Sequence, residues 1–370
     1  MAVDLHQKNI VRRACQGHNN DKTRMLDILW QVQDQLRCVD DDAMSLIAKL
    51  TGSFPVEVEG VVSFYAFFST EPLGKVVIRL CDDIVDRHAG LRELVEVCRD
   101  SLGIGFGQTT TDGQFSLQST PCIGMCDPAP AALINDLVFP RLTPAKLRSL
   151  INKFKRDPDP AHHIKRLGDG NNSHQLICSG VHNNIRLAGP VLLADYPAEA
   201  GLQCAATLPP QRILDQISKS GLRGRGGAGY SVSKKWQLAA TTPASQRYVI
   251  CNADEGEPGT FKDRVLLTEK AHLLIEGMTI AAKAINAEKG IIYLRGEYRY
   301  LLAYLQDVLQ ERRQCGLLGE RILDDDWHFD IRIQLGAGAY ICGEESSLIS
   351  SCEGQRGEPK NRPPFPAQAG

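Results

Sequence analysis

Hydrophobic residues recur at helical spacing near the start of the chain. Four apolar residues within residues 24–37 fall on one face of a helix: Met25, Leu29, Val32 and Leu36. This spacing is typical of an amphipathic helix with one buried side. Residues 41–52 also have a helical pattern and predict a second helix. The chain is therefore expected to open with helices.

Short apolar runs bounded by turn residues come next and alternate with helical patterns. The predicted strands cover residues 74–81 and 114–120, with a hairpin over 130–142. The predicted helices cover residues 91–103 and 143–156, the second capped by Thr143. This order predicts a small α/β layer, and we assign residues 1–156 to a first domain.

A polar, non-periodic stretch separates this domain from a second one. Residues 157–174 contain proline and glycine, and we assign residues 157–200 to a linker. Within residues 201–370 the predicted helices are 209–221, 271–285, 298–313 and 344–354, and the predicted strands are 247–254, 290–297 and 329–338. Alternating strands and helices predict a mostly parallel sheet covered on both faces. The fold class is therefore α/β in both domains.

Composition narrows the functional classes. The 370 residues carry a formal net charge of -2, without the basic excess of a nucleic-acid-binding protein. No apolar run approaches the ~18 residues that span a bilayer, and the N-terminal segment lacks the apolar core of a signal peptide. We expect a cytoplasmic protein. Most of its 12 cysteines are then free thiols, and only Cys122 and Cys126 are spaced as a tight ligand pair.

A glycine-rich stretch, GLRGRGGAGY at residues 221–230, is a candidate ligand loop. It matches G-x-G-x-x-G, but it follows a predicted helix, whereas the dinucleotide fingerprint follows a strand. It also lacks the G-K-[ST] of a phosphate-binding Walker loop. Close-approach glycines with Arg223, Arg225 and Lys235 nearby suit a phosphate or a flat ring. A flexible surface turn is the alternative.

Acidic residues cluster after two of the predicted strands. CNADEGEPGTFKDR (residues 251–264) and GAGAYICGEESS (residues 336–347) both end such strands. Open α/β sheets bind ligands at the carboxyl ends of their strands. Amide and carboxylate groups there can bind the edge of a flavin or the hydroxyls of a ribose. Solvated loop charge is the alternative explanation.

These three stretches, together with the end of the chain at residues 354–366, closely resemble the flavoprotein subunit of NADH dehydrogenases of the respiratory complex I type. Residues 1–155 resemble the small thioredoxin-like iron–sulfur subunit of the same enzymes. A single chain that combines these two regions resembles the diaphorase (alpha) subunit of soluble NAD-reducing hydrogenases. The resemblance implies N-terminal helices with a thioredoxin-like domain, followed by a Rossmann-like domain that binds FMN and NAD(H).

The resemblance also implies a set of cofactor contacts. For FMN these are Gly224, Arg225, Gly227, Lys235, Asn252, Asp254, Glu255, Gly343, Glu344 and Glu345. For NAD(H) they are Gly226, Tyr230, Lys235, Glu257, Tyr340 and Phe365, with Glu257 and Tyr340 as the candidate catalytic residues and Phe365 as an adenine-stacking ring.

The implied activity is hydride transfer between NAD(H) and FMN, with electrons passing to or from iron–sulfur clusters. The implied partners are other diaphorase and hydrogenase subunits that carry such clusters. The alternatives are the electron-input subunit of a respiratory NADH dehydrogenase or of an NAD-dependent formate dehydrogenase, and a truncated, non-catalytic scaffold.

The chain departs from the family pattern at two places. Thioredoxin-like relatives hold a [2Fe–2S] cluster with thiolates spaced C-x4-C and C-x3-C. Here Cys81, Cys122 and Cys126 match, but Asp86 occupies the fourth position. Because a carboxylate is a poor substitute for thiolate on iron, we expect a degenerate site and a docking role for this domain, with a bound cluster as the alternative.

The second departure concerns the C-terminus. The family continues beyond the PPFPAQAG of residues 363–370 through an Asn-rich flavin-contacting segment and a cysteine-rich region that binds a [4Fe–4S] cluster. The expectation is a fragment of a longer subunit, with its flavin site incomplete.

Overall fold

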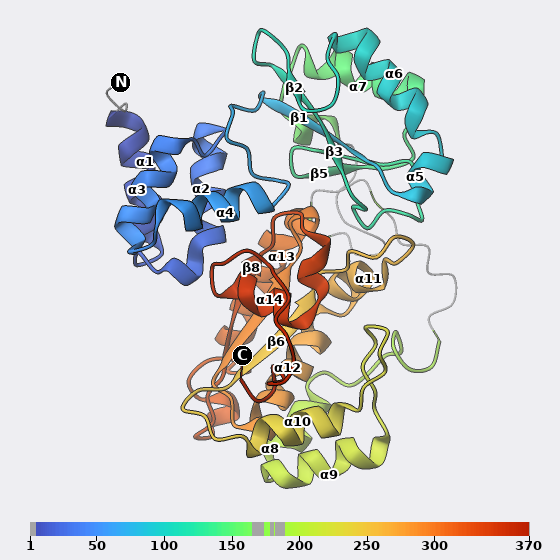
Figure 1. Ribbon diagram of the computed structural model, residues 1–370. Helices are drawn as coiled ribbons and strands as arrows, with labels where there is room; N and C mark the ends of the chain where they lie inside the picture. Colours follow the sequence, from blue (N-terminus) through green and yellow to red (C-terminus); the bar gives the residue numbers. More distant parts are fainter. Residues whose placement is uncertain (1–4, 165–173, 178–180, 182–188, 370) are drawn as a thin grey trace.

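The structure is a computed structural model that describes residues 5–164, 174–177, 181 and 189–369. Figure 1 shows three assemblies along the chain: a group of N-terminal helices, a small mixed sheet with its helices, and a larger C-terminal unit. Part of the predicted linker and the lone Cys178 lie outside the described residues.

The chain begins with four helices. They are α1 (Leu5–Gly17), α2 (Met25–Leu36), α3 (Asp41–Thr51) and α4 (Pro55–Phe64). Helices α2 and α3 were predicted, and both are confirmed. Helix α4 was not predicted, because Val56, Val58 and Gly60 have strand-like spacing. It begins at Pro55, and the Glu57 carboxylate accepts the Phe54 N–H at 2.8 Å, which caps the first turn.

The small sheet has the strand order β2-β3-β1-β4-β5. Its strands are β1 (Val76–Cys81), β2 (Gln108–Thr109), β3 (Phe115–Thr120), β4 (Ala132–Ile134) and β5 (Leu137–Phe139). Its helices are α5 (Ile84–His88), α6 (Leu91–Leu102) and α7 (Pro144–Phe154). The predicted order of strand, helix, strand, hairpin and helix is confirmed. Thr143 Oγ1 accepts the Lys146 N–H at 3.2 Å as the predicted cap.

The C-terminal unit contains a parallel three-stranded sheet. Strands β6 (Tyr248–Ala253), β7 (Lys289–Leu294) and β8 (Asp330–Leu335) pair in that order. The central strand is buried from Gly290 to Leu294. Because neighbouring side chains of a strand point to opposite faces, both faces of the sheet are covered, as predicted.

Seven α-helices are described in the C-terminal unit. They are α8 (Ala200–Ala206), α9 (Pro210–Ser220), α10 (Val232–Thr241), α11 (Lys262–Glu269), α12 (Ala271–Ile285), α13 (Leu302–Gln314) and α14 (Glu345–Cys352). Helix α10 directly follows the glycine-rich stretch, and the Ser231 side chain caps its first turn. The Rossmann-like alternation of strands and helices thus matches the predicted α/β class.

The hydrophobic cores do not follow the order of the chain. One core joins helices α1–α4 to the C-terminal unit, and a second core belongs to the small sheet. Trp30 of α2 donates from Nε1 to the Gly336 carbonyl after β8 at 3.1 Å. The Phe67 N–H, after α4, bonds to the Ala337 carbonyl at 3.0 Å. The N-terminal helices therefore pack against the loop that follows β8 and support it.

Candidate functional site

The loops after the two outer strands of the parallel sheet meet across the end of the central strand. Asn252, the second-last residue of β6, donates from Nδ2 to the carbonyl of Gly343 at 2.8 Å. A Cβ on Gly343 would lie 3.0 Å from the Asp254 carbonyl, so the two backbones pass very close. The acidic loops predicted from the sequence therefore form one continuous edge, as expected at the carboxyl ends of parallel strands.

A second contact between these loops joins the two candidate catalytic residues. The Tyr340 hydroxyl donates a 2.5 Å hydrogen bond to Glu257 Oε2. Tyr340 is 57 % exposed, and its bond to Glu257 raises the pKa of the phenol. The chain passes close to the ring, since a Cβ on Gly256 would lie 2.7 Å from Tyr340 Cδ2. Tyrosine and carboxylate together form an open, polar surface.

Basic side chains reach the same edge from two other segments. Lys235 of α10 forms an ion pair with Glu345 at the start of α14. Arg362, near the C-terminal end of the described chain, forms an ion pair with Glu344. Arg362 was not predicted, because a single arginine in a proline-rich stretch carries no distinctive signal. The Glu344 and Glu345 carboxylates are thus charge-compensated by side chains of this chain.

The glycine-rich stretch forms a loop closed on itself. The Gly224 N–H donates to the Tyr230 carbonyl at 2.8 Å, and Arg223 Nη1 donates to the Gly229 carbonyl at 3.1 Å. Gly227 and Gly229 have φ of 103° and 61°, which side-chain-bearing residues rarely adopt. Arg225 and Gly226 are exposed at its tip. The loop leads directly into α10 and so into Lys235.

Asp254 lies beneath this edge. Its Oδ2 atom is buried and has no hydrogen-bond partner among the described residues. Burial raises the pKa of this carboxyl to about 7. An unpaired buried oxygen of this kind fits a ligand that brings a polar N–H edge, as a flavin ring does.

The Glu255 side chain points into the protein, away from the exposed edge. Its carboxylate is buried and accepts the backbone N–H groups of Asp263 at 2.9 Å and Arg264 at 3.2 Å, and the Tyr298 hydroxyl at 3.0 Å. The side chain therefore fixes the start of α11 from inside the protein, and the flavin contact implied for Glu255 stays a prediction. Phe365 is 50 % exposed on the segment that carries Arg362, and its stacking role likewise stays a prediction.

The predicted cluster residues come together at the end of β1. Cys122 and Cys126 have their sulfur atoms 3.4 Å apart, and the Cys126 thiol lies 3.3 Å from Asp83 Oδ2. Ligand atoms of Cys81, Asp83 and Asp86 also lie within 4.8 Å of one another. Asp83 was not predicted as a member of this site, because it falls outside the C-x4-C register.

These residues fit an iron–sulfur group. Asp86 is buried, one carboxylate oxygen accepts the Ala131 N–H at 2.7 Å, and Oδ2 has no partner among the described residues. Burial raises its pKa to about 7, so a cation bound there would stabilise the charged form. The close ligand atoms form two groups that share Asp83: Asp83 with Cys122 and Cys126, and Asp83 with Cys81 and Asp86. Thiols and carboxylates in this arrangement are compatible with a bound cluster, and both the degenerate site and the bound cluster stay predictions.

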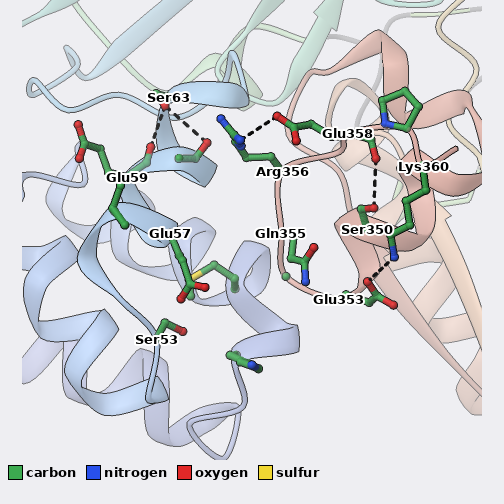
Figure 2. A pocket seen from close by; sticks show the side chains of 16 residues that line it. Ser53, Glu57, Glu59, Ser63, Ser350, Glu353, Gln355, Arg356, Glu358 and Lys360 are labelled. Atoms are coloured by element: carbon green, nitrogen blue, oxygen red, sulfur yellow. Dashed lines mark hydrogen bonds and ion pairs between the residues drawn. The ribbon is translucent and has the colours of Figure 1, made fainter. Parts of the chain in front are cut away.

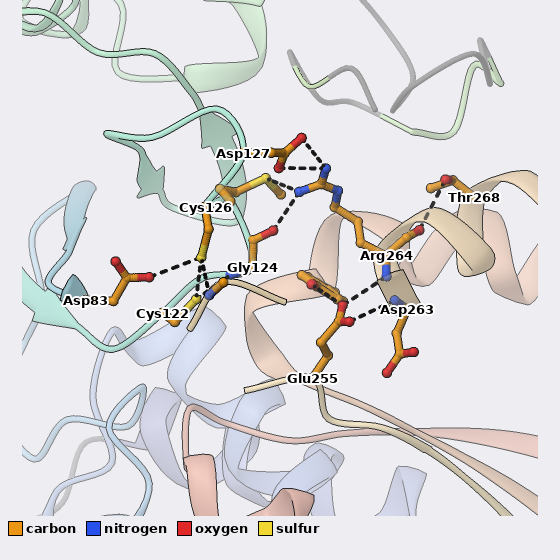
Figure 3. A network of polar contacts seen from close by, with 12 residues as sticks. Asp83, Cys122, Gly124, Cys126, Asp127, Glu255, Asp263, Arg264 and Thr268 are labelled. Carbon is orange, nitrogen blue, oxygen red and sulfur yellow. Dashed lines mark hydrogen bonds and ion pairs between the residues drawn. The ribbon is translucent and has the colours of Figure 1, made fainter. Parts of the chain in front are cut away.

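The loop of residues 121–127 carries Cys122 and Cys126 and is called the cluster loop below. Buried arginines attach it to the acidic stretch of residues 251–264, as Figure 3 shows for Arg264. Arg264 Nη1 donates to the Gly124 carbonyl at 2.6 Å, and Nη2 contacts the Asp127 carboxylate at 3.1 Å. Arg295 donates from Nη2 to the Cys122 carbonyl and from Nη1 to the Glu255 carbonyl. The two candidate sites thus share one polar network.

A large cavity lies outside the two candidate sites described above. Its volume is about 680 Å³, and it is bounded by α4 and by the segment after α14 (Figure 2). Glu57, Ser63, Arg356 and Lys360 are among the side chains that line it. None of the predicted site residues lines it. The cofactor edge described above is an open surface.

Comparison with known families bears on both sites. Residues 11–155 match the thioredoxin-like [2Fe-2S] ferredoxin family, and residues 217–370 match the Nuo51 FMN-binding domain. The chain joins these two domains. The predicted resemblance and the α/β class are confirmed.

Individual relatives agree with this result. The chain is 45% identical over 356 residues to the alpha subunit of the NAD-reducing hydrogenase HoxS of Cupriavidus necator, covering 95% of this chain and 59% of that subunit. It is 48% identical over 179 residues to one subunit of the NADH-quinone oxidoreductase of Aquifex aeolicus, covering 48% of this chain and 42% of that protein.

Solved structures support the same relationship. A crystal structure of an NAD+-reducing [NiFe]-hydrogenase in the H2-reduced state superposes with a TM-score of 0.82 at 38% identity, covering 95% of this chain and 58% of that one. The chain thus spans about three fifths of the hydrogenase chains it matches. Within its described residues, no helix is long and apolar enough to cross a membrane.

Proposed function

We propose that this chain is an FMN-containing NAD(H) oxidoreductase subunit of the diaphorase type, working with partner subunits that carry iron–sulfur clusters. The observation that carries the proposal is the convergence of both acidic loops on one edge, joined by the Asn252–Gly343 and Tyr340–Glu257 hydrogen bonds. When bound, FMN takes a hydride from NADH and releases its electrons one at a time.

The residues of this edge have distinct proposed roles. The exposed loop before α10 would contact FMN through the backbone of Gly224 and Gly227 and the guanidinium of Arg225. A basic, glycine-rich surface of this kind suits the phosphate of FMN. Lys235 would exchange its ion pair with Glu345 for the ligand. The amide of exposed Asn252 and the carboxyl of Asp254 beneath it would hold the polar edge of the ring.

The nucleotide would bind on the exposed side of the flavin. Tyr340 holds the Glu257 carboxylate in one position, so that Glu257 can accept hydrogen bonds from ribose hydroxyls or the carboxamide. Gly226, Tyr230 and Phe365 are exposed and would complete this surface. In this proposal the main role of the protein is to orient the nicotinamide against the flavin.

The thioredoxin-like domain would hold a [2Fe–2S] cluster through Cys81, Cys122, Cys126 and the Asp86 carboxylate. When bound, such a cluster exchanges single electrons. The match to a hydrogenase alpha subunit covers both domains, whereas the match to the NADH-quinone oxidoreductase protein covers about half of this chain. A soluble NAD-reducing hydrogenase is therefore the proposed setting. A cytoplasmic location follows from that setting.

The test is anaerobic reduction of the chain after reconstitution with FMN, iron and sulfide. Bound oxidised flavin absorbs visible light, and we expect NADH to bleach this absorbance because hydride transfer reduces the flavin. The Lys235→Ala variant should bind FMN at least tenfold more weakly, whereas Lys234→Ala, the exposed neighbour, should behave as the wild type. A protein that retains no flavin, or flavin that NADH does not bleach, would overturn the proposal.

A further inference from the structure

A single tight turn lies between the two proposed redox sites. Glu257, Pro258, Gly259 and Thr260 form a β-turn in which the Thr260 N–H donates to the Glu257 carbonyl at 3.2 Å. Gly259, the third residue, has φ of 87°. Proline at the second position and a glycine of positive φ at the third are typical of a type II turn. We call residues 257–260 the bridging turn.

The bridging turn touches both sites directly. At one end the Glu257 carboxylate accepts the Tyr340 hydroxyl at 2.5 Å on the exposed edge. At the other end the Gly259 N–H donates to the Cys126 sulfur at 3.0 Å. Only Pro258 lies between Glu257 and Gly259 in the backbone, and its ring fixes the φ dihedral angle at that position. A displacement of Glu257 is therefore passed to the Gly259 N–H.

The cluster loop is held too firmly to follow such a displacement. Arg264 is fully buried and binds both the Gly124 carbonyl and the Asp127 carboxylate. Arg295 is buried and binds the Cys122 carbonyl. Movement of the bridging turn would therefore change the Gly259–Cys126 hydrogen bond itself.

We propose that the bridging turn couples nucleotide binding at Glu257 to the reduction potential of the cluster held by Cys126. This inference rests on the proposed function. Hydrogen bonds to cluster sulfurs stabilise the reduced, more negative state and so raise the reduction potential. A nucleotide that engages Glu257 alters this bond, and by linkage the redox state of the cluster alters nucleotide affinity by the same factor.

The test measures the cluster, and it needs no turnover. The reconstituted chain is titrated potentiometrically, with the reduced cluster followed by electron paramagnetic resonance, in the presence and absence of ADP-ribose. This nucleotide lacks the nicotinamide and cannot exchange hydride. We expect saturating ADP-ribose to shift the midpoint potential of the wild-type cluster, and oxidised and reduced protein to bind ADP-ribose with correspondingly different affinities.

A substitution in the bridging turn should remove the coupling. A Cβ at Gly259 would meet no atom of the described residues within 4 Å, so Gly259→Ala is expected to act through its unfavourable positive φ. We expect a more negative cluster potential and no response to ADP-ribose. Gly319→Ala is the matched control, because Gly319 also has open space and a positive φ of 110°, but pairs with Phe329 at the opposite end of β8.

The outcomes separate the two proposals. A wild-type cluster whose potential ignores ADP-ribose, while calorimetry shows the nucleotide bound, overturns the coupling and leaves the proposed function intact. A chain that binds no cluster or no ADP-ribose overturns the proposed function and the coupling together. The wild-type comparison involves no variant, so a failure of Gly259→Ala to fold leaves the test decisive.

Discussion

The Tyr340 hydroxyl and the Glu257 carboxylate form a 2.5 Å hydrogen bond between loops that are 83 residues apart in sequence. Neither residue is buried, so the bond positions a carboxylate on an open surface. The helices α1–α4 support this arrangement from below, because they pack against the loop after β8. The geometry of the proposed nucleotide surface thus depends on segments from both ends of the chain.

Removing the Tyr340 hydroxyl should weaken the nucleotide surface. Hydrogen bonds to charged groups contribute about 1.5–3 kcal/mol, and solvent exposure reduces this value here. Tyr340→Phe should therefore lower the second-order rate of flavin reduction by NADH by roughly threefold to tenfold, measured by stopped-flow absorbance. Tyr248→Phe, an exposed tyrosine at the other end of β6, should leave this rate unchanged. Equal rates in all three proteins would show that Tyr340 does not position Glu257.

Breaking the buried Arg264–Asp127 ion pair should destabilise the protein. Arg264 has no exposed side-chain surface and Asp127 only 7 %, and removing one partner of a buried pair costs about 3–5 kcal/mol. We expect this loss for Arg264→Met in chemical denaturation, and a smaller loss for the double variant with Asp127→Asn. Arg92→Met breaks a pair in which Arg92 is 89 % and Glu96 57 % exposed, and it should cost less than about 1 kcal/mol. Additive losses in the double variant would contradict the pairing.

The docking of the cluster loop leaves no room for a side chain at Gly124. A Cβ there would lie 2.1 Å from the hydroxyl of buried Tyr298, and Gly124 has φ of 72°. Gly113 has a similar φ of 66° with open space around it, so Gly113→Ala isolates the conformational cost. We expect Gly124→Ala to lower the free energy of unfolding by about 2–4 kcal/mol more than Gly113→Ala. Equal losses would mean that the loop is not docked on Tyr298.

Because of the raised pKa of Asp254, we expect the stability of the flavin-free protein to depend on pH. Its folded pKa is about 7, against ~3.9 for an unperturbed aspartate. Between these values the folded state holds a proton that the unfolded state has lost, so stability falls as pH rises, and the full penalty is present above pH 7. Asp254→Asn should therefore stabilise the protein more at pH 8 than at pH 5, by on the order of 2 kcal/mol.

Thermal melts at both pH values, with exposed Asp326→Asn as the control, measure this difference. A difference that does not change with pH, or that changes in the opposite direction, would show that the carboxyl is already ionised in the fold.

The fourth cluster ligand can be identified by substitution. Asp86→Ala removes the unpaired Oδ2 atom and should reduce iron and sulfide content at least fivefold after reconstitution. Asp86→Cys supplies the thiolate of the C-x4-C spacing and should retain full content, with a changed paramagnetic resonance spectrum. Full iron content in Asp86→Ala would instead favour Asp83 as the ligand.

The sequence alone determined many of the helices and strands, and it indicated the chemical character of both candidate sites. Apolar periodicity located α2, α3, α6, α7, α12 and the main strands, because each of these buries one face or both. The Cys122–Cys126 spacing and the acidic stretches after β6 and β8 pointed to a cluster and a ligand edge. Glu257, Pro258 and Gly259 are likewise readable as a turn, since proline and glycine restrict the backbone locally.

Only the tertiary structure decided which of these parts meet. Contacts such as Trp30 with Gly336, Arg264 with Gly124 and Gly259 with Cys126 join segments more than a hundred residues apart. No local pattern encodes such contacts, because they depend on how whole elements pack. The orientation of Glu255 was decided in the same way: its neighbours in space, Tyr298 and the start of α11, hold its side chain inside the protein.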